Sequence, residues 1–246
     1  MASKAPTTTD GRMGGGPLSL RLIYLCTSNV CRSPLAEAVA ASIVASRGLG
    51  AQVEVLSRGL TDGYSRWGHP AEPRMCAAAA KLRLDAGTMA RLAGHGSTLL
   101  TRAEAEDPRT LLFLVTAHHA DWATDAVGAD VMSAARAAGR VRLIDSAGGD
   151  VADPFFGGEE EYETVAAHVV SELPRTLDKA LRDYGVLPPD APACLPPVED
   201  YGASASATSS SLSSSSSSSL AAAAEQGRKF GARQGAAYAP PGAGAT

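Results

Sequence analysis

Residues 20–34 read LRLIYLCTSNVCRSP, an apolar run followed by small residues, an arginine and a proline. The run at 20–25 is typical of a strand in a parallel sheet, because such strands are buried on both faces. Ser33 is a favourable N-cap and Pro34 a favourable first helical residue. The segment therefore predicts a strand, a tight loop and a helix start in direct succession.

The same alternation of short apolar runs and longer helical patterns continues along the chain. Further strands are expected at 53–57, 111–116 and 141–144, and helices at about 33–47, 72–83, 119–138 and 159–183, with a short helical turn at 102–106. The alternation predicts an α/β fold, a four-stranded parallel sheet flanked by helices on both faces in a doubly wound, flavodoxin-like arrangement. Ligands of such sheets bind beyond the carboxyl ends of the strands, so the loop after residue 25 is the expected site.

The chain of 246 residues is expected to hold one folded domain at 20–187. It follows an N-terminal segment at 1–19 that is expected to be disordered. From residue 188 a proline-rich linker leads into a tail in which Ser, Ala and Gly make up 31 of the 46 residues 201–246. So few large apolar side chains cannot offset the entropy of ordering the chain, so the tail is expected to be disordered too.

Charge and apolar patterning exclude several classes of protein. The net charge of −4 argues against nucleic-acid binding by bulk attraction. No apolar run reaches the roughly 18 residues of a membrane span, and no membrane partner is expected. The first 19 residues lack a secretory signal, and an organelle transit peptide stays open. Four irregularly spaced cysteines favour a reducing compartment, so we expect a cytoplasmic protein.

The loop after the first strand combines an anion cradle with a nucleophile. Its backbone N–H groups and the following helix N-terminus favour an anion, and Arg32 offers a fork of donors that matches phosphate oxygens. Cys26 lies six residues before Arg32, where the arginine, the amides and the Ser33 hydroxyl are expected to hold its thiol as thiolate. The pattern therefore indicates nucleophilic attack on phosphorus.

The spacing Cys-x5-Arg-Ser, followed by Pro34, resembles the low-molecular-weight protein tyrosine phosphatase family. A second motif, Asp153-Pro154-Phe155-Phe156-Gly157, resembles the general-acid loop of that family. The resemblance implies the phosphotyrosine protein phosphatase I-like fold and hydrolysis of phosphotyrosine, or of small aryl phosphates, through a phosphocysteine on Cys26. Asp153 would act as general acid and then as general base. No cofactor and no metal are implied.

The resemblance also assigns supporting roles. The phosphate would be bound by Thr27, Ser28, Asn29, Val30, Cys31, Arg32 and Ser33. Asn29 would adopt a positive φ, and Ser33 would hydrogen-bond the thiolate. Ser57 and His95 would support this loop. Two positions depart from the family pattern: Ser28 replaces a glycine, and Ala117 replaces an aspartate that could orient His95.

Further residues are expected at the rim and in regulation. Tyr64 and Trp67 would form an aromatic wall of the substrate pocket together with Phe155 and Phe156. Val30, where family members acting on phosphoarginine tend to carry threonine, resembles the phosphotyrosine type. Cys31 would form a reversible disulfide with Cys26 after oxidation. The expected partners are phosphotyrosine-containing proteins, and the protein is expected to be a monomer or weak dimer.

Three alternative functions remain to be weighed. A protein arginine phosphatase would use the same loop. An arsenate reductase would need two further cysteines close in sequence, whereas Cys76 lies in an expected helix and Cys194 in the linker. A non-catalytic phosphoprotein-binding module would keep the loop without the chemistry. His118, His119 and Asp121 form a dense cluster, which we interpret as a solvated helix start rather than a metal site.

Overall fold

The computed structural model describes residues 19–65 and 68–198, and its centre is a sheet of four parallel strands. The strand order is β2-β1-β3-β4. The strands are β1 (Leu20–Cys26), β2 (Val53–Gly59), β3 (Thr110–Leu114) and β4 (Val141–Leu143). This arrangement confirms the predicted four-stranded parallel sheet.

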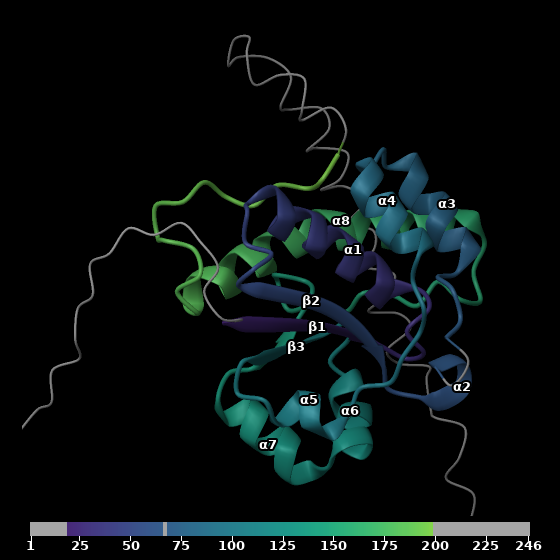
Figure 1. Cartoon of the computed structure of the whole chain (residues 1–246). Helices are drawn as coiled ribbons and strands as arrows, with labels where there is room; N and C mark the ends of the chain where they lie inside the picture. Colours follow the sequence, from purple (N-terminus) through teal and green to yellow (C-terminus); the bar gives the residue numbers. More distant parts are fainter. Residues whose placement is uncertain (1–18, 66–67, 199–246) are drawn as a thin grey trace, which may run out of the picture.

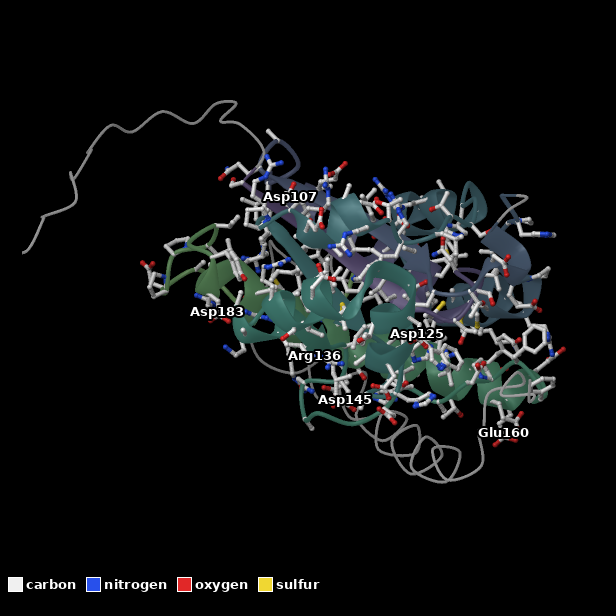
Figure 2. All side chains as sticks on the ribbon, turned by 90° about the horizontal axis from the view of Figure 1, so that it is seen from below. Asp107, Asp125, Arg136, Asp145, Glu160 and Asp183 are labelled. Carbon is white, nitrogen blue, oxygen red and sulfur yellow. The ribbon has the colours of Figure 1, made fainter. Side chains whose placement is uncertain are left out.

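Helices cover both faces of the sheet (Figure 1). One face carries α1 (Arg32–Ser46), α3 (Pro73–Lys81), α4 (Ala86–Ala93) and α8 (Glu159–Asp183). The other face carries α5 (Arg102–Glu106), α6 (His119–Val127) and α7 (Ala129–Ala137). The short α2 (Asp62–Ser65) lies beyond the carboxyl end of β2. Figure 2 looks onto α6 and α7, where Asp125 and Arg136 are exposed, and Glu160 and Asp183 mark the two ends of α8.

The alternation of side chains along β1 divides the core into two halves. Tyr24 and Cys26 belong to the cluster under α1 and α8, whereas Ile23 and Leu25 belong to the cluster under α5, α6 and α7. All four are almost fully buried. A central strand buried on both faces has this pattern, which explains why residues 22–26 of β1 are apolar without interruption.

Gly128 separates two helices where the sequence predicted one helix over 119–138. It adopts φ 101° and ψ 145°, a conformation that breaks the helix and that side chains other than glycine rarely adopt. The chain therefore turns between α6 and α7, and the single-helix prediction is wrong. Two further differences are that the helix expected over 72–83 ends at Lys81, and that α4 was not predicted.

The helix after the first strand begins earlier than predicted. α1 starts at Arg32, Cys31 occupies the N-cap position, and no side chain caps the helix there. Ser33 is therefore the second helical residue and not the N-cap, and Pro34 is the third. The Ser33 hydroxyl contacts Cys26 and Asn29 instead of capping the helix N-terminus.

The segment from Gly185 to Val198, part of which was expected to be a linker, packs against the domain. Arg182 donates hydrogen bonds to the carbonyls of Pro188, Pro189 and Ala191. Leu187 and Cys194 are buried. The expected tail at 201–246 and residues 1–18 lie outside the described residues. Among the described helices, none is both long and apolar enough to cross a membrane.

Candidate active site

The loop at residues 26–33, called the phosphate loop below, lies at the point where the strand order reverses. β1 pairs with β2 on one side and with β3 on the other. The connection after β1 leads to β2 and the connection after β3 leads to β4, so the two leave in opposite directions. The crevice between such connections is where doubly wound sheets bind ligands. The segments after β3 and β4 reach the same edge, because Val151 donates its N–H to the Val115 carbonyl at 2.7 Å.

The nucleophile candidate Cys26 ends β1 and faces a serine hydroxyl. Cys26 Sγ lies 3.0 Å from Ser33 Oγ. Asn29 Nδ2 donates to the same Ser33 oxygen at 3.0 Å. Because that oxygen accepts from the amide, the hydroxyl proton of Ser33 is available for the sulfur. A hydrogen bond of this kind stabilises a thiolate relative to a thiol.

Asn29 organises the loop from its centre. It is fully buried and adopts φ 55°, which agrees with the expected positive φ. Its side chain donates to Ser57 Oγ at 2.8 Å and accepts from the Thr98 N–H at 2.8 Å. His95 Nε2 lies 2.7 Å from the Asn29 carbonyl oxygen, to which it donates. Ser57 and His95 thus both contact the loop through Asn29.

Glu37 of α1 completes a chain of hydrogen bonds that ends at Cys26. Ser57 Oγ donates to Glu37 Oε2 at 2.6 Å, and Arg91 donates to Glu37 Oε1 at 3.1 Å. Glu37 Oε2 also lies 4.0 Å from Nδ1 of His95. Ala117 stands after β3, where the family pattern has an aspartate that could orient His95, and its N–H donates to Asp150 Oδ1 at 2.7 Å. Glu37 therefore supplies the carboxylate from a different element.

Arg32 pairs with Asp153, which joins the two motifs found in the sequence. Arg32 NH2 donates to Asp153 Oδ2 at 2.8 Å, and NH1 donates to the Val151 carbonyl at 3.0 Å. The Arg32 side chain is only 4% exposed, whereas that of Asp153 is 41% exposed. The carboxylate thus reaches from the surface to a buried guanidinium. A bound phosphoryl group would replace it there, because the same fork of donors matches phosphate oxygens.

Arg74 of α3 holds the loop that carries Asp153. Its guanidinium donates to the carbonyls of Gly157 at 3.2 Å and Phe155 at 3.3 Å. It also lies 4.5 Å from the ring centroid of Tyr162, the distance of a cation–π contact. Asp153 Oδ1 accepts the N–H of Phe155 at 3.1 Å, which fixes the carboxylate within its own turn. Arg74 is thus a positioning group for the acid loop.

The rim residues have different surroundings. Phe156 is 90% exposed, and Phe155 packs edge-on against it with ring centroids 5.2 Å apart. Val30 is buried, with 8% of its surface exposed. The backbone of Tyr64 lies in α2, and Trp67 lies outside the described residues. The expected aromatic wall therefore stays a prediction for Tyr64 and Trp67.

Ser28 does not adopt a positive φ, so the side chain in place of glycine brings no left-handed strain. Its hydroxyl lies 3.2 Å from Thr61 Oγ1, and Thr61 Oγ1 donates to the Thr27 carbonyl at 3.1 Å. The segment after β2 thus contacts the loop at Thr27 and Ser28.

His119 corrects the interpretation of the His118–His119–Asp121 cluster as a solvated helix start. His118 and Asp121 are exposed, but His119 is 4% exposed and lies 3.1 Å by Nε2 from Thr27 Oγ1. Burial, with the nearby Arg32 and His118, holds the pKa of His119 well below its usual range. Among the described residues, no group of three His, Cys, Asp or Glu side chains is arranged to hold a metal ion.

Cys31 is buried beside the nucleophile, and burial raises the pKa of its thiol well above the ordinary value. Arg32 lowers this pKa in part, and Cys26 raises it further. Cys31 is therefore held as a neutral thiol. Cys76 lies in α3, and Cys194 is buried in the segment after α8.

Three features of this site were not predicted from the sequence: Glu37, Arg74 and the role of His119. Glu37 and Arg74 lie on helix surfaces and carry no local motif. His119 was noticed but interpreted from its neighbours in sequence, which are exposed. Only the approach of other elements identifies these residues.

The chain is similar to known phosphatases over most of the described domain. Residues 21–184 match the family model described as low molecular weight phosphotyrosine protein phosphatase. A low molecular weight protein-tyrosine-phosphatase of Streptomyces coelicolor is 36% identical over 155 residues, which cover 59% of this chain and 84% of that protein. The low molecular weight protein-tyrosine phosphatase A of Mycobacterium tuberculosis is 32% identical over 162 residues, with 63% and 88% covered.

A solved structure of the YwlE arginine phosphatase, a Bacillus subtilis protein, has a similar fold. It superposes with a TM-score of 0.51 at 26% identity, covering 66% of this chain and 96% of that chain. That structure is of a cysteine-to-serine mutant, and the active-site serine is phosphorylated. The similarity thus includes relatives described by two different phosphorylated residues, tyrosine and arginine.

Proposed function

This chain belongs to the low molecular weight phosphotyrosine protein phosphatase family, and on that premise we propose how its residues hydrolyse phosphotyrosine. The observation that carries the proposal is the meeting of Cys26, Ser33 and the Arg32–Asp153 pair at the end of β1. The nucleophile, the phosphate-binding cation and the acid come from two distant parts of the chain. Their convergence at one loop is what the chemistry needs.

In the first half-reaction the phosphoryl group enters the phosphate loop and takes the place of Asp153 on Arg32. The thiolate of Cys26 attacks phosphorus, an S–P bond forms, and the bond from phosphorus to the tyrosyl oxygen breaks. Asp153 in its protonated form gives its proton to that oxygen, so the leaving group departs as a neutral phenol. Arg32 and the loop N–H groups stabilise the charge on the equatorial oxygens.

In the second half-reaction water hydrolyses the phosphocysteine. Asp153, now a carboxylate, accepts a proton from the water as its oxygen attacks phosphorus. The S–P bond breaks, inorganic phosphate leaves, and the thiolate returns. The Ser33 hydroxyl stabilises the departing thiolate, so the Ser33–Cys26 contact serves both steps.

Phosphotyrosine is the proposed substrate class, and phosphoarginine is the competing one. The proteins of Streptomyces coelicolor and Mycobacterium tuberculosis are described as protein-tyrosine phosphatases, whereas YwlE is described as an arginine phosphatase. The apolar, buried Val30 favours the aromatic substrate. A non-catalytic binding role is disfavoured by the presence of both Cys26 and Asp153.

Regulation and location complete the proposal. Cys31 is proposed to trap an oxidised Cys26 as a disulfide, which reductants reopen. If a Cys31→Ser protein recovers activity after peroxide and reductant as fully as the parent, this role is wrong. We propose a cytoplasmic monomer or weak dimer without nucleic-acid partners, supported by four free cysteines and a net charge of −4.

Hydrolysis of para-nitrophenyl phosphate from pH 4.5 to 8, with a chelator present, tests the mechanism. The parent should turn over with an acid optimum, Cys26→Ser should be inert, and Asp153→Ala should be strongly slowed. Cys76→Ser and Asp125→Ala, which change the same residue types away from the site, should behave as the parent. An active Cys26→Ser protein would refute the mechanism. Phosphotyrosine and phosphoarginine peptides then separate the two substrate classes.

A further inference from the structure

His119 contacts the phosphate loop from the opposite layer of the fold. The supports described above for Asn29 come from β2, the segment after α4 and, through Glu37, α1. His119 begins α6, on the other face of the sheet. Side chains alternate along β1, so Thr27, which follows Cys26, continues toward the α6 side. Its hydroxyl meets His119 Nε2 there at 3.1 Å.

The contacts of the imidazole define which nitrogen carries the proton. Thr116 Oγ1 accepts the backbone N–H of His119 at 3.4 Å and lies 2.5 Å from its Nδ1. We assign Thr116 as the donor to Nδ1, because its oxygen already accepts the backbone N–H and its own proton is left for the ring. In a neutral ring the proton then resides on Nε2, which donates to Thr27 Oγ1.

The surroundings keep this ring neutral and in place. His119 is 4% exposed, and Trp122 packs edge-on with ring centroids 5.1 Å apart. The charged groups that act on it are Arg32 and His118, and together with burial they hold its pKa well below the usual range.

We propose that His119 is a positioning residue that sets the Thr27 hydroxyl as a hydrogen-bond donor to the bound phosphoryl group. Thr27 Oγ1 accepts from Nε2, so its own proton is left for another acceptor. Within residues 19–65 and 68–198 it donates in no other hydrogen bond. Two threonine hydroxyls and one imidazole thereby form a directed chain from Thr116 to the anion site. This inference rests on the proposed function and adds a donor to the phosphate site.

The Thr27 carbonyl is held independently, which makes the hydroxyl a precise donor. It accepts the N–H groups of Leu60 and Thr61 at 2.9 Å each and the Thr61 hydroxyl at 3.1 Å. The end of β2 thus fixes the backbone of Thr27, and α6 fixes the side chain. Because both the backbone and the side chain of Thr27 are held before the ligand binds, its hydroxyl loses little conformational entropy on binding.

Titration of the full chain with inorganic phosphate by calorimetry tests the proposal. Thr27→Val and His119→Leu should each weaken phosphate binding on the order of tenfold, the worth of one hydrogen bond to a charged group. The double variant should bind no more weakly than either single variant, because both remove the same donor. His119→Gln should bind as the parent, because its amide nitrogen reaches the position of Nε2. His118→Leu is the matched control and should have no effect.

Several results would overturn the inference. Thr27→Val that binds phosphate as the parent, or losses that add in the double variant, would show that the two residues act separately. If His119→Leu does not fold, His119→Asn replaces it, since its shorter amide reaches only the position of Nδ1. If the His119→Asn and His119→Gln proteins bind phosphate equally well, the role of Nε2 is refuted. A parent that neither binds phosphate nor hydrolyses para-nitrophenyl phosphate refutes the proposed function itself, whereas a binding parent with unaffected variants refutes this inference alone.

Discussion

Replacing Glu37 by glutamine keeps the shape of the hydrogen-bond chain behind Cys26 and removes its charge. Glu37 accepts from Ser57 at 2.6 Å, and the chain continues through Asn29 and Ser33 to the sulfur. The carboxylate fixes the Ser57 hydroxyl as a donor to Glu37, so Ser57 Oγ accepts one amide proton of Asn29. The other amide proton of Asn29 goes to Ser33 Oγ, whose own proton is left for the sulfur. With an amide there, Ser57 can still donate, but to a neutral oxygen.

The size of the effect follows from the two kinds of hydrogen bond. Bonds to a charged group contribute about 1.5–3 kcal/mol and neutral ones about 0.5–1.5 kcal/mol. The Glu37 side chain is 15% exposed, so solvent screens it only in part. We therefore expect Glu37→Gln to lose ~1 kcal/mol of transition-state stabilisation, which is about fivefold in kcat/KM. Glu37→Ala leaves Ser57 and Arg91 without this acceptor and should lose ~2 kcal/mol, about thirtyfold.

Steady-state hydrolysis of para-nitrophenyl phosphate at pH 6 measures both variants. Glu54→Gln is the matched control, because Glu54 lies on β2 away from the loop and pairs with Arg21 at 2.5 Å. It should keep the parent rate. Circular dichroism establishes that each protein is folded. A folded Glu37→Ala protein with kcat/KM within twofold of the parent would refute the idea that this carboxylate acts on the nucleophile.

Three further predictions concern stability, each measured by urea unfolding. Gly128→Ala should lower the free energy of unfolding by ~1–2 kcal/mol, because φ is 101° and the added Cβ would lie 2.6 Å from Arg102 NH1. Gly50→Ala is the control, because a Cβ at Gly50 meets no atom within 4 Å. Equal losses of stability in the two variants would contradict strain at Gly128. Asp145→Ala should cost about 3–5 kcal/mol, because it leaves His168, fully buried and 2.8 Å from the carboxylate, without that partner; a loss below ~1 kcal/mol would be inconsistent with this. The pKa of His119 is lowered in the native state, so below the ordinary histidine pKa of 6.5 the unfolded chain binds a proton at His119 and the native state does not. The free energy of unfolding should therefore fall as the pH drops from about 7 to 5, by up to ~1.4 kcal/mol per pH unit. His119→Gln should lose this part of the slope, and an unchanged slope would show that His119 titrates alike in both states.

Local sequence predicted the features that neighbouring residues determine. The run at 20–25 is apolar at every position except Arg21 because β1 is covered on both faces, so its burial could be inferred without a structure. The loop from Cys26 to Ser33 is contiguous, so the nucleophile and the arginine that faces phosphate could be found by spacing. Asp153 was found because proline and two aromatic residues follow it in a recognisable motif.

Local rules failed where a distant element changed the outcome. Ser33 has the chemistry of an N-cap, but Cys26 and Asn29 offer its hydroxyl other partners, and α1 begins at Arg32. Gly128 can adopt φ 101° because it has no Cβ. The carbonyl just before it, that of Val127, accepts a hydrogen bond from NH1 of the distant Arg102 at 3.0 Å. Neither preference is visible in a window of neighbouring residues.

The sequence alone therefore determined the class of fold and singled out the proposed nucleophile, the proposed phosphate-binding arginine and the proposed acid, because each belongs to a short contiguous pattern with its own chemistry. Only the tertiary structure decided which groups tune them. Glu37, Arg74 and His119 reach the site from α1, α3 and α6, through contacts that span 20 to 92 positions of the chain. Such contacts depend on how helices pack on the sheet, and that packing is set by the burial of whole faces rather than by the residues beside each functional group.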